Sequence, residues 1–198
     1  MGLVSYRPVV AALIGCWAIY FFGFLINHLR VRRRRVAEGD RSRRVFSARA
    51  SDLGLLLEGV GILVVIAFRR SHPSDVSVLL PAASLSLAAG SIVFAWVALW
   101  HLGRQWRIRA VVTDDHALVT TGPYALVRHP IYTSLFGMLA ATAILVAHWW
   151  AAIAGMLVYV AGTETRIRAE EGILARRFPS EFPAYRKRVA AWLPLARR

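Results

Sequence analysis

Apolar runs alternate with arginine-rich segments along this chain of 198 residues. Three runs lie in the first half, at residues 9–29, 53–68 and 76–102, and a longer one covers residues 131–163. The first run, read as an α-helix, measures about 31 Å and matches the hydrocarbon core of a bilayer. It is too long for the apolar part of a signal peptide, so we interpret it as a retained membrane helix.

The fourth run would form a single helix of about 50 Å, far longer than a bilayer requires. Charge favours a different arrangement, because segments 30–49, 103–130 and 164–198 contain 22 of the 25 lysine and arginine residues. The positive-inside rule places all three segments in the cytoplasm. The third can join the other two only if residues 131–163 fold back as a hairpin, with its turn near His148, Trp149 and Trp150.

We therefore predict an all-α integral membrane protein with about five transmembrane helices, the last two a short hairpin, plus cytoplasmic C-terminal helices. Its N-terminus is expected outside and its C-terminus in the cytoplasm. Residues 1–102 would hold three transmembrane helices and the basic loop 30–49. Residues 103–198 would hold a cytoplasmic loop, the hairpin 131–163 and the C-terminal helices. The alternative has four spans and a tail on the outside.

The C-terminal tail has apolar residues at helical spacing. This spacing predicts one helix over residues 163–178, which ends before Pro179. A second would begin at Ser180, with Phe182, Tyr185, Val189 and Trp192 three or four positions apart. This spacing, among basic residues, is typical of an amphipathic helix lying on a membrane surface.

Composition narrows the class of protein. The chain is 57% hydrophobic with a formal charge of +14, and a nucleic-acid-binding protein would share the charge but not this apolar content. Its wealth of arginine and alanine favours a GC-rich bacterial genome, and therefore the bacterial inner membrane. The single cysteine, Cys16, lies in an apolar run, so we expect neither a disulfide framework nor a cysteine-based metal site.

A first candidate site lies directly before the fourth apolar run, at Arg128, His129 and Pro130. Proline suits the first turn of a helix, where its missing N–H would be unpaired anyway. The other N–H groups and the helix dipole favour an anion there, so two potential cations at this end need an anion beside them. The structural interpretation is that Arg128 extends to lipid phosphates.

A second candidate is the stretch "ETRIRAEEGIL". Arg166 and Glu170 are four residues apart and share one helix face, with Glu171 on a neighbouring face. Arg166 could bind a carboxylate through two parallel hydrogen bonds, and Glu170 could face a cationic or hydroxyl-bearing ligand. The simpler interpretation is an ordinary surface ion pair.

The second apolar run contains an acidic residue, Glu58, which is costly within a membrane unless it is paired or hydrated. It could be protonated, bonded to a neighbour or exposed to a polar cavity. Gly54, Gly59 and Gly61 in the same run favour close helix packing over a phosphate-binding loop. No G-x-G-x-x-G motif follows a strand pattern, which excludes a soluble-type dinucleotide site.

The motifs "HALVTTGPYALVRHPIY" and "RIRAEEGILARRF", separated by the predicted hairpin, resemble the isoprenylcysteine carboxyl methyltransferase family. The likeness covers residues 116–194, and the chain is more distantly similar to phospholipid N-methyltransferases. The resemblance implies a helical membrane enzyme that uses S-adenosylmethionine without a Rossmann domain. By position, Arg166 would hold the methyl acceptor, while Arg128 and Glu171 complete the motif. The cofactor would be bound by His116, Ala117, Leu118, Val119, Tyr124, His129, Pro130, Ile131, Tyr132 and Glu170.

The expected reaction is methyl transfer from S-adenosylmethionine to a lipophilic acceptor, most simply a carboxylate, as in a protein-S-isoprenylcysteine O-methyltransferase; S-adenosylhomocysteine is the product. A carboxylate needs no general base, so the protein supplies positioning and excludes water. An amine or thiol acceptor, as in a phospholipid or other small-molecule N- or S-methyltransferase, is the alternative, and Glu58 is the obvious base for an amine. A third interpretation is a non-enzymatic transporter or scaffold.

The expected partners are membrane lipids and the acceptor, not nucleic acid or a metal. The sequence does not define an oligomeric state.

Overall fold

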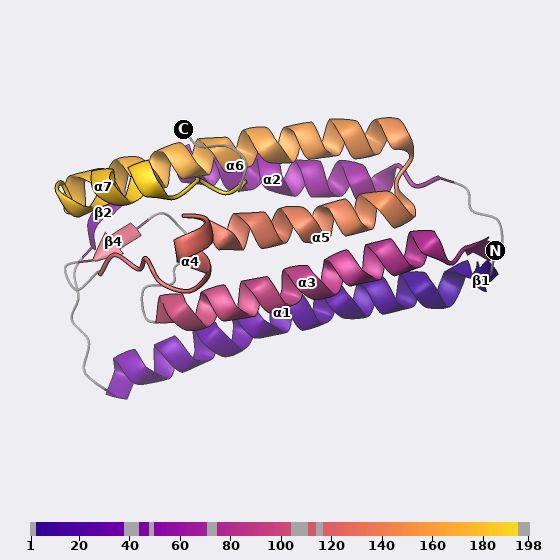
Figure 1. The fold of residues 1–198 in the computed structure, drawn as a ribbon, viewed down its shortest axis with the longest axis horizontal. Coiled ribbons are helices and arrows are strands. Elements are labelled where there is room, and N and C mark those ends of the chain that lie inside the picture. The colour runs from indigo at the N-terminus through magenta and orange to yellow at the C-terminus, as the bar shows by residue number, and fades with distance from the viewer. Residues whose placement is uncertain are drawn as a thin grey trace.

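A computed structural model describes residues 3–37, 44–47, 50–70, 75–103, 111–113 and 117–193. Within these residues, five long helices lie side by side along one axis (Figure 1). They are α1 (Tyr6–Ala37), α2 (Ala50–Ala67), α3 (Leu79–Leu102), α5 (Pro130–Val146) and α6 (Trp149–Arg177). Two short helices, α4 (Pro123–Leu126) and α7 (Glu181–Arg188), lie at one end of the bundle.

Two small antiparallel sheets, which the hydrophobic pattern does not predict, join loops at the two ends of the bundle. Strand β1 (Leu3–Ser5) pairs with β3 (Asp75–Ser77), and β2 (Arg44–Ser47) pairs with β4 (Val111–Thr113). All four are three or four residues long. The protein is therefore predominantly helical, and the predicted helical class is confirmed in this sense.

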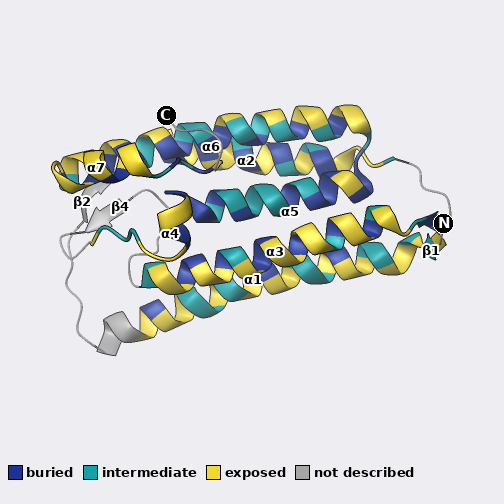
Figure 2. Cartoon of the chain, viewed as in Figure 1, coloured by how far each residue is buried: buried dark blue, intermediate teal, exposed yellow. Residues whose placement is uncertain are grey.

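Three helices, α1, α2 and α3, are long and apolar enough to cross a membrane, and they coincide with the first three apolar runs. Large apolar side chains on them are exposed, among them Phe21, Leu63 and Val93, as expected of surfaces that face lipid. Helix α5 is also apolar but has only 17 residues. It lies in the middle of the bundle, and its residues are mostly buried or half-buried (Figure 2).

The chain reverses direction between α5 and α6, close to the predicted turn. Helix α5 ends at Val146 and α6 begins at Trp149. The intervening backbone is bonded to the segment after α2, because His148 donates to the carbonyl of Phe68 at 3.0 Å. Helix α6 then continues unbroken from its apolar part into the polar tail. Residues 149–177 are thus one helix, where the sequence indicated a short membrane arm followed by a separate tail helix.

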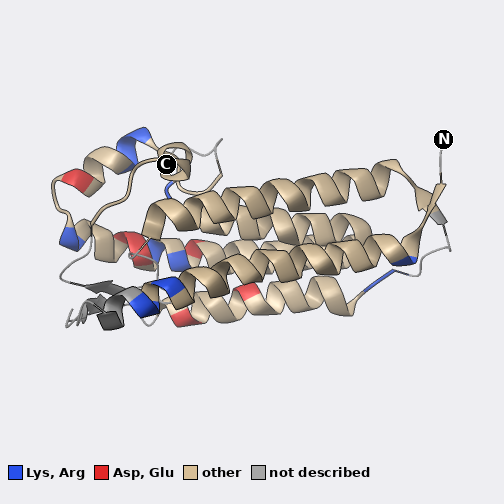
Figure 3. Ribbon diagram, turned by 90° about the horizontal axis from the view of Figure 1, so that it is seen from below, with Lys and Arg blue, Asp and Glu red and all other residues tan. Residues whose placement is uncertain are grey.

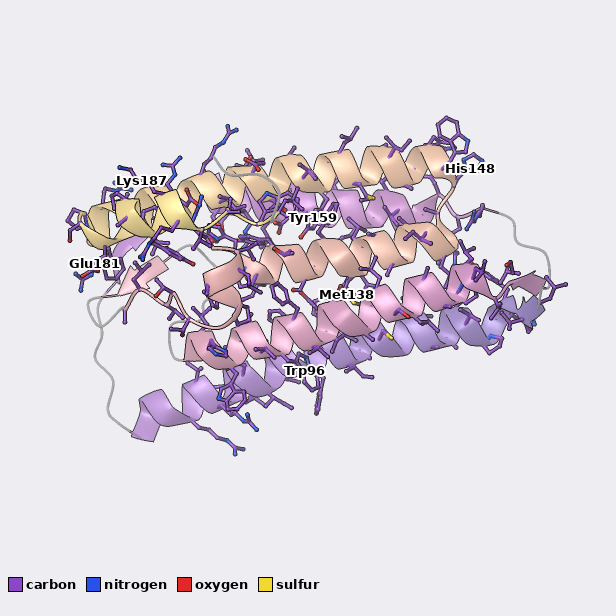
Figure 4. The ribbon with its side chains drawn as sticks, viewed as in Figure 1. Trp96, Met138, His148, Tyr159, Glu181 and Lys187 are labelled. Carbon is purple, nitrogen blue, oxygen red and sulfur yellow. The ribbon has the colours of Figure 1, made fainter. Side chains whose placement is uncertain are left out.

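The two ends of the bundle differ in charge. The ends of the long helices near the α1–α2 and α3–α4 connections lie together with the last turns of α6 and with α7 (Figure 1). Most of the described charged residues gather here (Figure 3), and we call this the charged end. Glu181 and Lys187 lie at it, whereas His148 marks the opposite end (Figure 4). The first described residues, in β1, also lie at that opposite end.

Helices α2 and α6 touch through their backbones at a seam of glycines. A Cβ added to Gly162 would lie 2.6 Å from the carbonyl oxygen of Gly54 and 2.8 Å from the backbone nitrogen of Glu58. Likewise, a Cβ on Gly61 would lie 2.5 Å from the carbonyl oxygen of Gly155. Such small residues allow membrane helices to approach closely. The same role expected of Gly59 is wrong, because a Cβ there would meet nothing within 4 Å.

We expect Gly162→Ala to lower the free energy of unfolding by about 1–3 kcal/mol, because rigid backbone on α2 would have to move away from the new methyl group. Thermal unfolding of the protein in detergent measures the effect. Gly59→Ala adds the same methyl group on the open face of α2, and it should maintain or slightly raise the melting temperature, because alanine favours a helix more than glycine does. Equal melting temperatures for the two variants would show that the seam is not tightly packed.

The tail beyond α6 departs from the prediction. Helix α7 ends at Arg188, so Val189 and Trp192 lie outside it. Phe182 and Tyr185 are buried against Phe178 of the same chain rather than facing a bilayer. The predicted amphipathic helix through Trp192 is therefore wrong in length and in what its apolar face contacts.

Candidate active site

The loop before α5 is shaped by a glycine and a proline. Gly122 has a φ of 59°, and a Cβ on it would lie 2.4 Å from the ring of His101, so no other residue fits without strain. Short α4 follows directly. His129 then precedes α5 as its N-cap, and Pro130 is the first helical residue, as the sequence indicated. Arg128 and His129 consequently lie buried at the charged end.

A C-terminal strap, residues 189–193, covers this loop. Ala190 pairs with Val127 in a parallel bridge. The backbone N–H of Arg128 donates to the carbonyl of Ala190 at 2.9 Å, and that of His129 donates to Ala191 at 2.8 Å. The strap therefore satisfies backbone donors that would otherwise need an external partner.

Trp192 anchors the strap. Its side chain is only 2% exposed and packs against Tyr132 and Ile167. Its indole N–H donates to Glu164 Oε1 at 3.0 Å, and its carbonyl accepts a hydrogen bond from the Thr133 hydroxyl. This residue joins α5, α6 and the tail, whereas the helical spacing of the tail predicts that it lies on a membrane surface.

The two cations before α5 meet two carboxylates of α6. Arg128 donates through Nε to Glu171 Oε1 at 2.8 Å, and its Nη2 lies 2.6 Å from the same oxygen. His129 Nδ1 lies 3.4 Å from Glu170 Oε2, and its Nε2 lies 3.4 Å from Glu171 Oε1. The anions that Arg128 and His129 require are thus supplied by the chain itself. Arg128 is buried in an ion pair and does not extend to lipid phosphates.

These contacts favour a charged imidazole. Burial alone would lower the pKa of His129, but its hydrogen bonds to Glu170 and Glu171 outweigh this and raise it. Burial would likewise raise the pKa of both carboxyls, but the interaction with His129 outweighs it and lowers each one. Because each ring nitrogen faces a carboxylate oxygen, both can act as donors only in the imidazolium form.

Tyr132 and Arg166 extend this cluster towards α2. The Tyr132 hydroxyl donates to Glu170 Oε1, and its ring stacks on that of His129 with centroids 5.7 Å apart. The Arg166 guanidinium carbon lies 5.0 Å from the centre of the Tyr132 ring, within the range of a cation–π contact. Arg166 Nη2 also lies 3.9 Å from Glu170 Oε1.

Glu58 is bonded to neighbouring side chains, which is one of the three alternatives that its position in the apolar run left open. Its Oε2 lies 2.9 Å from Arg166 Nη1, and its Oε1 accepts a hydrogen bond from the Thr163 hydroxyl at 3.1 Å. The acidic residue inside the second apolar run is therefore one end of an ion pair between α2 and α6.

The structure brings His129, Tyr132, Arg166 and Glu170 together, as predicted for a shared site. Tyr124 is buried in α4, and its pKa is raised by burial and further by the charges of Tyr185 and Glu170. The remaining predicted residues are placed as follows. Pro130 is buried, Ile131 and Val119 are half-buried, Ala117 is exposed, and Leu118 packs on the cluster of Phe178, Phe182 and Tyr185, whereas His116 lies outside the described residues.

An apolar helical bundle with a polar cluster buried at one end fits an integral membrane protein. Residues 82–176, from α3 to the end of α6, match the model of the isoprenylcysteine carboxyl methyltransferase (ICMT) family. Over this segment the chain is similar to that family.

Curated relatives of two kinds resemble the chain. It is 34% identical over 141 residues to the nickel-cobalt-cadmium resistance protein NccN of Alcaligenes xylosoxydans xylosoxydans. This match covers 67% of the chain and 60% of that relative. A similar match, 34% over 120 residues, is to the cobalt-zinc-cadmium resistance protein CzcN of Cupriavidus metallidurans, covering 59% of the chain and 49% of that protein. The chain is 37% identical over 81 residues to the protein-S-isoprenylcysteine O-methyltransferase of Schizosaccharomyces pombe. This match covers 41% of the chain and 34% of that protein. The matches thus span between a third and three fifths of the relatives' lengths.

Proposed function

We propose that this protein is an integral-membrane methyltransferase that moves a methyl group from S-adenosylmethionine to a lipophilic acceptor, most simply a carboxylate. The observation that carries the proposal is the cluster of His129, Tyr132, Arg166 and Glu170, which the family-matched segment assembles at the charged end. The match to the ICMT family model and the names of relatives from yeasts and rice support the reaction class.

The chemistry of the cluster fits S-adenosylmethionine. The Glu170 side chain is half-buried among its partners and 24% exposed, so it can accept hydrogen bonds from an ammonium or a ribose hydroxyl. Both ring nitrogens of imidazolium His129 face Glu170 and Glu171, so His129 would hold the Glu170 carboxylate in place beside the cofactor. The remaining predicted cofactor residues precede α5 or form its first turn. When bound, the cofactor supplies a methyl group already activated by its sulfonium.

The chain itself positions the acceptor. A guanidinium such as that of Arg166 can bind a carboxylate through two parallel hydrogen bonds. Carboxylate methylation needs no general base, so alignment and exclusion of water, to which the strap contributes, suffice. An amine acceptor would need a base, but both oxygens of the obvious candidate, Glu58, already accept bonds from Thr163 and Arg166. A carboxylate acceptor is favoured on this ground.

The orientation that we propose has α5 and the apolar part of α6 as the fourth and fifth membrane helices. The charged end would then face the cytoplasm of a bacterium and the N-terminus would lie outside. The gathering of most of the described charged residues at the end of the bundle that holds α7 and the last turns of α6 supports this arrangement. A reporter that works only in the cytoplasm should be active when it is fused after Arg198, and a reporter that works only in the periplasm should be inactive there. Activity of a periplasmic reporter at that position would rule the arrangement out.

Binding of S-adenosylhomocysteine tests the enzyme directly. Titration calorimetry of the detergent-purified protein should show saturable heat, and Glu170→Gln should weaken affinity by about tenfold to a hundredfold through loss of a charged acceptor. The exposed Glu181 provides a matched control, and Glu181→Gln should bind as the wild type does. A wild-type protein that gives no saturable heat would favour a scaffold or transporter instead.

Transfer of tritiated methyl groups distinguishes the acceptors. Membrane lipids and S-farnesylcysteine are offered as substrates, and the labelled product is treated with base. A methyl ester releases volatile methanol, whereas N- and S-methyl groups stay bound. Label that is stable to base would move the proposal to the amine or thiol alternative.

A further inference from the structure

Glu58 belongs to α2, outside the family-matched segment, yet its side chain reaches the cluster. It is fully buried, and Arg166 and Thr163 of α6 each engage one of its oxygens. The site is therefore built from two parts of the chain that are far apart in sequence.

The glycine seam is arranged around this ion pair. A Cβ on Gly54 would lie 2.4 Å from Cγ of Arg166, so the guanidinium reaches α2 only because Gly54 has no side chain. Gly162, four residues before Arg166, lets the Glu58 backbone approach α6 in the same way. The close contact of the helices thus surrounds the ion pair and fixes its geometry.

Stability alone does not account for such a pair. Two ions in an apolar interface lose hydration, and apolar residues of similar size often stabilise a protein as well or better. Membrane-embedded ion pairs are accordingly a sign of function. Here one member of the pair, Arg166, also faces Tyr132 and Glu170.

We infer that Glu58 is a positioning residue that holds the Arg166 guanidinium in the orientation needed to bind the acceptor carboxylate. The inference rests on the proposed function. Without the Glu58 charge, Glu170 is the next carboxylate within reach of Arg166, at 3.9 Å. The guanidinium would turn towards it and away from the acceptor. Helix α2 is then an essential part of the acceptor site, although the family match begins after it.

A double-mutant cycle tests this with S-farnesylcysteine as the probe and tritiated S-adenosylmethionine as the donor. Glu58→Gln keeps the size of the side chain and an acceptor for Thr163 but removes the charge. Glu58→Gln should raise the KM for the probe by about tenfold, and the single variant Arg166→Lys should also raise this KM. Because Glu58 acts through Arg166, the double variant should be no worse than Arg166→Lys alone. Glu181→Gln, the same change on an exposed residue, should leave the KM unchanged.

Three results would overturn the inference: a wild-type KM in Glu58→Gln, losses that add in the double variant, or activity that falls only in proportion to the folded fraction. If the wild type labels membrane lipid but not the probe, initial rates with the lipid extract replace the KM in the same cycle. A wild-type protein that neither binds S-adenosylhomocysteine nor transfers methyl groups refutes the proposed function itself. An active wild type with an unaffected Glu58→Gln variant refutes only the positioning role.

Discussion

Replacing Arg166 by alanine is expected to lower the free energy of unfolding by about 3–5 kcal/mol and to abolish methyl transfer. The loss of stability follows from Glu58, whose carboxylate would remain buried between α2 and α6 without its cation. The loss of activity follows from the missing acceptor ligand. Unfolding of the detergent-solubilised protein and the tritium assay measure the two effects separately.

A paired variant separates stability from activity. Arg166→Met together with Glu58→Gln removes both charges, so it should recover most of the stability but none of the activity. Arg168→Ala is the matched control, because this side chain is 76% exposed and its ion pair with Glu164 is long, at 3.9 Å. Its effect should stay below about 1 kcal/mol. If Arg166→Ala were as stable as this control, the buried ion pair would not exist as described.

Trp192→Ala should lower the free energy of unfolding by about 3–5 kcal/mol, the usual range for removing a buried aromatic side chain. Its ring fills the space between Tyr132 and Ile167, and its indole nitrogen is the donor to Glu164. The substitution should also weaken binding of S-adenosylhomocysteine, because Tyr132 would lose the surface that supports it. Thermal unfolding and calorimetry measure the two consequences.

The adjacent residue gives the comparison. Leu193 is 37% exposed, so Leu193→Ala should change the melting temperature little and leave cofactor affinity unchanged. A Trp192→Ala protein that unfolds at the wild-type temperature would mean that the strap is not held by its tryptophan. The strap would then contribute nothing to the site.

Local patterns were enough to predict the features that depend on local physics. The length of the apolar runs predicted α1, α2 and α3, and proline chemistry predicted that α5 begins at Pro130. Helical spacing placed Arg166 and Glu170 on one face, where they are 3.9 Å apart. The membrane crossing of α5 and α6 remains a prediction.

The remaining features depend on contacts between distant segments. Trp192 keeps helical spacing with Tyr185, but the chain leaves the helix at Val189 because the loop before α5 offers hydrogen bonds to the strap. Periodicity within the tail contains no information about that loop. The ion pair of Glu58 was hidden for the same reason, since an apolar run with one acid does not reveal which helix provides the cation.

The Glu58–Arg166 pair also constrains how the protein is made. The two residues are 108 positions apart, so α2 leaves the ribosome long before α6 does. The membrane-insertion machinery must therefore accept a helix with a solitary acid and retain it until its counter-charge has been synthesised. Replacing the cation would therefore be expected to lower the yield of inserted protein, in addition to lowering the stability of the protein that is recovered.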